Sequence, residues 1–139
     1  MEQTYAIELK NITKRFGKIV ANDGINLKVK RGEILSLLGE NGSGKTTLMN
    51  MISGIYFPDE GRILVDGKAV SIRSPKDSFD LGIGMIHQHF KLIDVMTAAE
   101  NIILGLKGNA VLDMKKVHKD IQELVDRYGF DLDPAQKVY

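Results

Sequence analysis

Apolar and polar residues alternate along the first part of the chain, and this alternation predicts β-strands. Residues 25–29 show it most clearly, because every second position is apolar and the positions between are polar. Residues 6–12 alternate more weakly and are also expected to form a strand. Residues 34–38 are almost continuously apolar, which favours a strand covered on both faces. A Gly-rich loop over residues 39–44 and a short helix over 46–53 are expected to follow.

Turn and cap signals organise the middle of the chain. Residues 62–65 and 68–72 flank Asp66-Gly67, a pair typical of a two-residue hairpin turn. The next pair, Ser74-Pro75, has the pattern of a helix cap followed by proline at the first helical position. A hairpin and then a short helix ending near residue 81 are therefore expected.

The C-terminal third has stronger helix signals, after one more expected strand over residues 83–86. Thr97 is followed three residues later by Glu100, which is the spacing of a capping box. Residues 113–128 form the best amphipathic pattern, and Gly129 follows as a stop. The apolar stripe of that helix consists of Val117, Ile121, Leu124, Val125 and Tyr128. Strand and helix signals together predict a mixed α/β fold.

Composition narrows the function classes. The chain has 139 residues, which suits about one domain. The formal net charge is +1, so no general affinity for nucleic acid is expected. The sequence has no cysteine, which excludes disulfides and thiolate-ligated metal sites. The longest apolar runs are far shorter than the roughly 20 residues of a membrane-spanning helix.

The strongest chemical signal is the segment 39–46, Gly-Glu-Asn-Gly-Ser-Gly-Lys-Thr, which matches the phosphate-binding pattern G-x-x-x-x-G-K-[ST]. Its glycines let successive backbone N–H groups point at phosphate oxygens, and the helix that follows adds its partly positive N-terminus. Lys45 can reach the β- and γ-phosphates, and the Thr46 hydroxyl is a suitable ligand for Mg²⁺. The predicted nucleotide-binding residues of the loop are Gly39, Asn41, Gly42, Ser43, Gly44, Lys45, Thr46 and Thr47.

The sequence contains other segments with the form of nucleotide-site motifs. The run 63–66 has the form of an apolar strand ending in a metal-binding aspartate, but Asp66 is better explained as part of the hairpin turn. The guanine-reading pattern N-K-x-D of GTPases is absent from the sequence. A P-loop kinase or another soluble phosphotransferase stays open as an alternative at this point.

The wider sequence resembles the start of an ABC-type ATP-binding subunit. The phosphate loop and the preceding segments 10–17 and 21–29 carry the first part of the resemblance. The run Gly84-Met85-Ile86-His87-Gln88 is similar to the family's Q-loop, and the following segment 96–102 is similar to the start of its helical subdomain. Residues 85–92 most resemble the ATPases of simple-sugar and nucleoside importers.

The resemblance implies an organisation and further site residues. It implies the nucleotide-binding lobe of an ABC ATPase, with an antiparallel β subdomain, over residues 1–92, and the beginning of the helical subdomain over 93–139. It assigns Phe16 to stacking on adenine, with phenylalanine where the family often has tyrosine. It assigns Gln88 to Mg²⁺ and the attacking water. Lys45 and Gln88 are thus the expected catalytic residues, and Thr46 and Gln88 the expected metal ligands, with ATP and Mg²⁺ as cofactors.

The resemblance also implies partners and a truncation. The family's signature loop of type L-S-G-G-Q, its second metal-binding aspartate with the adjacent catalytic glutamate, and its switch histidine do not occur in the 139 residues. The chain is therefore expected to be an N-terminal fragment that does not hydrolyse ATP by itself. The full-length subunit is expected to be an importer ATPase at the cytoplasmic face of the membrane. Its implied partners are permease subunits, a second ATP-binding domain in a head-to-tail dimer and, indirectly, a substrate-binding protein. A soluble ABC-type ATPase without a transporter is the other open alternative.

Overall fold

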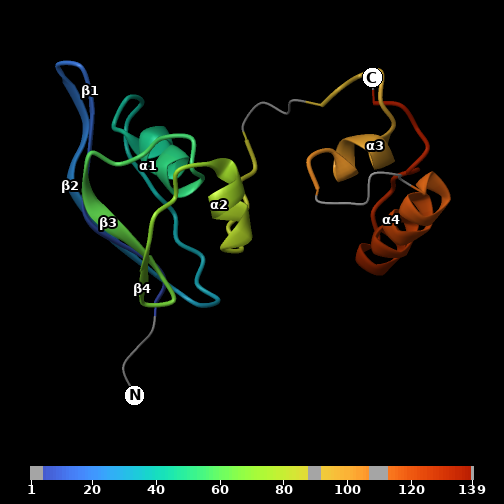
Figure 1. The fold of residues 1–139 in the computed structure, drawn as a ribbon, viewed down its shortest axis with the longest axis horizontal. Coiled ribbons are helices and arrows are strands. Elements are labelled where there is room, and N and C mark those ends of the chain that lie inside the picture. The colour runs from blue at the N-terminus through green and yellow to red at the C-terminus, as the bar shows by residue number, and fades with distance from the viewer. Residues whose placement is uncertain (1–4, 88–91, 107–112, 139) are drawn as a thin grey trace. The chain divides into compact units, whose positions relative to one another are not determined.

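The computed structural model describes residues 5–87, 92–106 and 113–138 (Figure 1). Contacts between residues divide the chain into two units, Met1–Ile86 and His87–Tyr139. Gln88 lies outside the described residues. Each unit has its own hydrophobic core.

The first unit is built on an antiparallel sheet. Its strands are β1 (Tyr5–Phe16), β2 (Ile19–Lys30), β3 (Glu60–Val65) and β4 (Lys68–Val70), in the spatial order β2-β1-β3-β4. Every neighbouring pair runs antiparallel. The strands predicted over 6–12 and 25–29 are confirmed as parts of longer strands, β1 and β2.

The turn between β3 and β4 confirms the predicted hairpin. Asp66 and Gly67 both have positive φ angles, of 49° and 76°, as a two-residue turn of type I′ requires. The Asp66 carboxylate also forms an ion pair with Arg31 at 2.7 Å. Asp66 is therefore part of a turn, and the interpretation as a metal ligand at a strand end is not needed.

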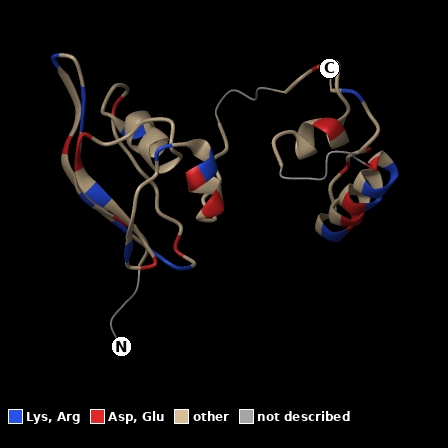
Figure 2. Cartoon of the chain, viewed as in Figure 1, with Lys and Arg blue, Asp and Glu red and all other residues tan. Residues whose placement is uncertain are grey.

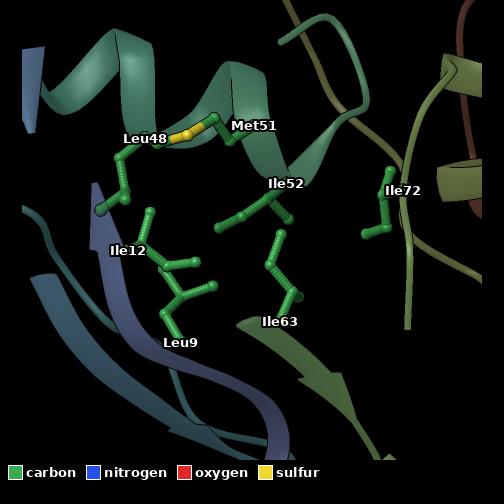
Figure 3. Close-up of a cluster of buried hydrophobic side chains, with 7 residues drawn as sticks. All are labelled: Leu9, Ile12, Leu48, Met51, Ile52, Ile63 and Ile72. Carbon is green, nitrogen blue, oxygen red and sulfur yellow. The ribbon is translucent and has the colours of Figure 1, made fainter. Parts of the chain in front are cut away.

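Helix α1 (Lys45–Ile52) packs on the sheet and forms the main core of this unit (Figure 3). Its buried face meets apolar side chains of β1 and β3, and burial of each such side chain contributes about 1.5–3 kcal/mol. The core consists of Leu9, Ile12, Leu48, Met51, Ile52, Ile63 and Ile72. A second helix, α2 (Pro75–Asp80), begins after Ser74, whose side chain accepts a hydrogen bond from the Asp77 backbone at 3.2 Å.

Two expected strands are not present, and this corrects the sequence-based prediction. Residues 34–38 and 83–86 belong to no strand of the described residues. The side chains of Ile34 and Leu38 are 96% and 91% exposed. A continuously apolar strand is stable only between neighbouring strands, and the four-stranded sheet does not extend to these segments. Leu37 and Ile83 nevertheless pack against the core.

The second unit contains α3 (Ala98–Ile103) and α4 (Met114–Tyr128), as predicted. The capping box at the start of α3 is confirmed, because Thr97 and Glu100 bond to each other's backbone N–H. A small core joins the helices and consists of Ala99, Ile121 and Val125, with Ile103 and Val117 packed against it. Basic and acidic residues both occur along α4 (Figure 2).

The end of α4 differs in part from the predicted stripe. Gly129 caps the helix in the left-handed conformation, as expected, with a φ of 67°. Leu124 and Tyr128, however, are 46% and 64% exposed. Tyr128 stacks instead on Phe130, with ring centroids 5.9 Å apart. Only the part of the stripe that faces α3 is buried.

Hydrogen bonds of Asp59 connect the loop after α1 to the end of β1. Its carboxylate accepts hydrogen bonds from the Arg15 backbone N–H at 2.7 Å and from the Lys14 ammonium at 2.9 Å. Its own backbone N–H donates to the Thr13 carbonyl at 2.9 Å. The Arg15 N–H and the Lys14 ammonium lower the pKa of the Asp59 carboxyl below its usual value.

Removing this carboxylate should change how the stability of the chain depends on pH. Because the pKa is lower in the folded state than in the unfolded state, the charged form stabilises the fold at neutral pH, and this contribution is lost as the pH falls through the folded pKa. Asp59→Asn is therefore expected to lower the urea midpoint at pH 7, and the difference from the unaltered chain should shrink at acid pH.

Circular dichroism measured against urea at several pH values tests this expectation. Asp23→Asn is the control, because it removes an exposed carboxylate of β2 that makes no hydrogen bond among the described residues and that acts on the nearby Arg15 guanidinium only through its charge. A deficit for Asp59→Asn that stays constant across the pH range would contradict the role assigned to the charge.

Candidate functional site

The predicted phosphate loop connects the segment after β2 to the first turn of α1. Gly42 and Gly44 both have φ angles of 84°, in the left-handed region that favours glycine. The Ser43 backbone N–H donates to the Glu40 carbonyl at 3.2 Å, which closes a turn within the loop. Gly42 and Gly44 are therefore residues at which the loop backbone curls, whereas Gly39, the first glycine of the predicted loop, has no positive φ angle.

Gly44 lies directly against β2. A Cβ atom at this position would overlap the Ala21 carbonyl oxygen and would lie 2.8 Å from Nδ2 of Asn22. The same Asn22 amide donates to the Gly44 carbonyl at 3.3 Å. Only glycine allows the start of α1 to approach the strand this closely.

The first turn of α1 presents backbone donors without a side-chain cap. Gly44 is the N-cap residue, and among the described residues no side chain accepts a hydrogen bond from the first N–H groups of the helix. The first N–H groups of any helix lack partners inside the helix and carry partial positive charge. Here these groups belong to the first helical residues, Lys45, Thr46 and Thr47. They suit an anionic ligand such as a phosphate.

The Lys45 ammonium lies over the same loop. It donates to the carbonyls of Gly39 and Glu40 at 2.7 and 2.6 Å and to the Ser43 hydroxyl at 3.1 Å. These three bonds use all the hydrogens of an ammonium group. The loop therefore holds a positive charge next to the uncapped helix start.

The other loop residues fit the expected roles to different degrees. Thr46 is exposed at the helix start, and its hydroxyl makes no hydrogen bond within the described residues, so it is free to ligate a hard cation. Asn41 is exposed at the tip of the loop, and Thr47 is half-buried. The residues present thus fit a magnesium–phosphate group at the Thr46 side of the loop.

Phe16 lies at the end of β1, near the strand segment that contacts the loop. It is in register with Ile19 of β2, while Lys14, two residues earlier, is in register with Asn22. Asn22 in turn bonds to Gly44. Phe16 and the Asn22 residue that contacts the loop therefore belong to the same strand pair, β1 and β2. Gln88, the other residue assigned through the resemblance, lies outside the described residues.

Two residues near the site were not predicted from the sequence to belong to it. Asn22 is 6% exposed, and its Oδ1 atom has no hydrogen-bond partner among the described residues. Tyr56 contacts Phe16 with its ring at 71° and the centroids 5.1 Å apart. Asn22 is a polar residue in an alternating strand and Tyr56 an aromatic residue in a loop. Neither belongs to a sequence motif, so the sequence did not indicate a role for either residue at the site.

Comparisons with known proteins agree with this geometry. Residues 22–139 match the ABC transporter family. The chain is 53% identical over 136 residues to the guanosine import ATP-binding protein NupO of Bacillus subtilis, covering 96% of this chain and 27% of that protein. It is 51% identical over 136 residues to the nucleoside import ATP-binding protein NupA of Lactococcus lactis, with the same two coverages, 96% and 27%.

Solved structures show the same fold. A nucleotide-free ATP-binding cassette from an ABC transporter aligns with a TM-score of 0.79 and 25% identity, over 96% of this chain and 57% of that one. A dimeric bacterial ABC transporter cassette aligns with a TM-score of 0.73 and 30% identity, over 95% and 61%. The chain thus spans about a quarter of the two curated relatives and somewhat over half of these cassettes.

No helix within the described ranges is long and apolar enough to span a bilayer. The family match covers most of the sequence and includes the phosphate loop with its glycine turn. The fold alignments extend that match to nearly the whole chain. The chain therefore belongs to the ABC transporter family of ATP-binding proteins.

Proposed function

We propose that residues 39–47 bind the phosphates of ATP and that the chain is part of the ATPase subunit of an importer for nucleosides or simple sugars. The uncapped start of α1, beside two glycines at positive φ, is the observation that carries the phosphate site. Backbone N–H groups and a helix N-terminus form a favourable environment for phosphate without further side chains.

Lys45 supplies the side-chain positive charge of this proposed site. Its ammonium exchanges at least one of its bonds to the loop carbonyls for a phosphate oxygen, because all three of its hydrogens are already used. A charge-assisted bond to phosphate is stronger than a bond to a neutral carbonyl. The exchange therefore favours the bound state.

The metal role is assigned to Thr46 and Gln88. Thr46 offers a free hydroxyl at the helix start, and Gln88 is proposed as a ligand and as the residue that orients the attacking water. Mg²⁺, when bound, supplies positive charge that offsets the negative charge of the phosphates. Phe16 is proposed to stack on the adenine base.

The relatives support an importer in preference to a soluble phosphotransferase. Their names describe guanosine, nucleoside and ribose import ATP-binding proteins. By this comparison the proposed partners are permease subunits, a second ATP-binding domain and, through the permease, a substrate-binding protein. The proposed location is the cytoplasmic face of the membrane.

The 139-residue chain is proposed to bind ATP without turning it over. The signature loop, the second metal-binding aspartate with its catalytic glutamate and the switch histidine are not in the sequence. Water activation and charge stabilisation in phosphoryl transfer need such groups in addition to the phosphate loop.

Lys45→Met should weaken ATP binding by on the order of tenfold or more, because a charge-assisted bond contributes about 1.5–3 kcal/mol. Isothermal titration with MgATP measures this directly. Lys68→Met, an exposed lysine of β4, is the matched control and is expected to bind like the unaltered chain. Equal affinities for all three chains would contradict the phosphate site.

Phosphate release gives the second readout for these same chains. At saturating MgATP, release by the unaltered chain should equal that of Lys45→Met. A higher rate for the unaltered chain would show that residues 1–139 suffice for hydrolysis and would overturn the proposed inactivity.

The importer assignment is tested in cells that carry the native gene. Replacing the Lys45 codon by a methionine codon should abolish uptake of either labelled guanosine or labelled ribose, whereas the Lys68→Met allele should leave uptake intact. The solute that is lost identifies the substrate class. If uptake of nucleosides and simple sugars is unchanged, the protein does not energise their import.

A further inference from the structure

Exposed apolar side chains gather at the end of the β1–β2 hairpin. Phe16 and Ile19 are register partners and are 41% and 69% exposed. Tyr56, from the loop after α1, contacts Phe16 and is 36% exposed. We call these three residues the hairpin patch. Exposed apolar patches of this kind mark ligand or partner sites more often than isolated apolar residues do.

The loop that carries Tyr56 is held on two sides. The backbone N–H groups of Ile55 and Tyr56 donate to the Asn50 carbonyl of α1 at 2.9 and 3.1 Å. Asp59 binds the Arg15 backbone, directly before Phe16. Tyr56 and Phe16 are therefore anchored to α1 and to β1 and are not loose surface side chains.

The same helix connects the patch to the phosphate loop. The N-terminus of α1 forms the proposed phosphate site, and its last turn holds the Tyr56 loop. A helix of eight residues spans roughly 12 Å. A nucleotide carries phosphates at one end and a planar aromatic base at the other. It could therefore contact the phosphate site with one end and the hairpin patch with the other.

The contact between the two rings leaves one face of the Phe16 ring free of Tyr56. Their planes are at 71°, so one ring meets the other with its edge. Such a contact occupies at most one face of the Phe16 ring. The Lys14 ammonium also lies over this ring, 5.5 Å from its centroid, so a base that stacks on the same face has to displace it. The Tyr56 hydroxyl has no hydrogen-bond partner within the described residues, so the ring itself makes the contact.

We propose that Tyr56 is a positioning residue for base recognition, which holds the Phe16 ring by its edge-to-face contact in the orientation that stacks on the adenine of ATP. This inference rests on the proposed phosphate site and on the base-stacking role of Phe16. Tyr56 acts through Phe16, so its loss should weaken ligands that contain a base and leave the phosphate contacts unchanged.

The neighbouring Phe57 offers a matched control. It is 46% exposed, similar to Tyr56, but it lies beside the Arg73 guanidinium, 5.1 Å from the ring centroid. Among the described residues it makes no ring contact with Phe16. Substituting Phe57 removes an aromatic ring from the same loop without touching the Phe16 contact.

The experiment compares the affinity for ATP with that for inorganic tripolyphosphate, which has phosphates and no base. Tyr56→Ala is expected to weaken ATP binding about three- to tenfold and to leave tripolyphosphate binding unchanged. Tyr56→Phe should bind both ligands like the unaltered chain, because it keeps the ring. Phe57→Ala should also bind both normally.

Each other outcome is decisive. Equal weakening of both ligands by Tyr56→Ala means that the ring only supports the fold, and unchanged ATP affinity means that it does not position the base; either result overturns the inference. If Tyr56→Ala does not fold, Tyr56→Leu keeps the apolar bulk and should show the same selective loss. If the unaltered chain binds neither ligand, the proposed phosphate site itself is wrong.

Discussion

The close approach of α1 to β2 is the constraint on which the proposed site depends. Gly44 has no Cβ, so its backbone lies against the Ala21 carbonyl and the Asn22 side chain. Because the helix begins at this point of contact, its first N–H groups and the Lys45 ammonium converge on one loop. A side chain at position 44 would move the helix start away from the strand and disperse these donors.

The rest of the first unit holds α1 in the orientation that this contact requires. Leu48, Met51 and Ile52 fix the direction of α1 by packing on β1 and β3. The Asp59 hydrogen bonds join the loop after the helix to the end of β1. The two ends of α1 are thus held by different strands, and the phosphate loop and the hairpin patch are positioned by the same short helix.

Local signals in the sequence predicted local structure well. The Asp66-Gly67 turn, the Thr97–Glu100 capping box and the Gly129 stop depend on residues close in the chain, and each formed as expected. The strands expected over 34–38 and 83–86 are absent from the described residues. Their formation depends on hydrogen-bond pairing with strands distant in the sequence, which a local pattern does not reveal. The Tyr56–Phe16 contact could not be predicted for the same reason, since 40 residues separate the two rings. The roles of the loop residues and of Phe16 and Gln88 stay predictions.

The most direct test of the central claim is an amide NMR titration of the chain with MgATP. If backbone N–H groups at the start of α1 bind the phosphates, the largest shift changes should fall on residues 42–47, with smaller changes at the end of β1. Amide signals of residues 42–47 that do not move while ATP binds would place the nucleotide elsewhere and contradict the account.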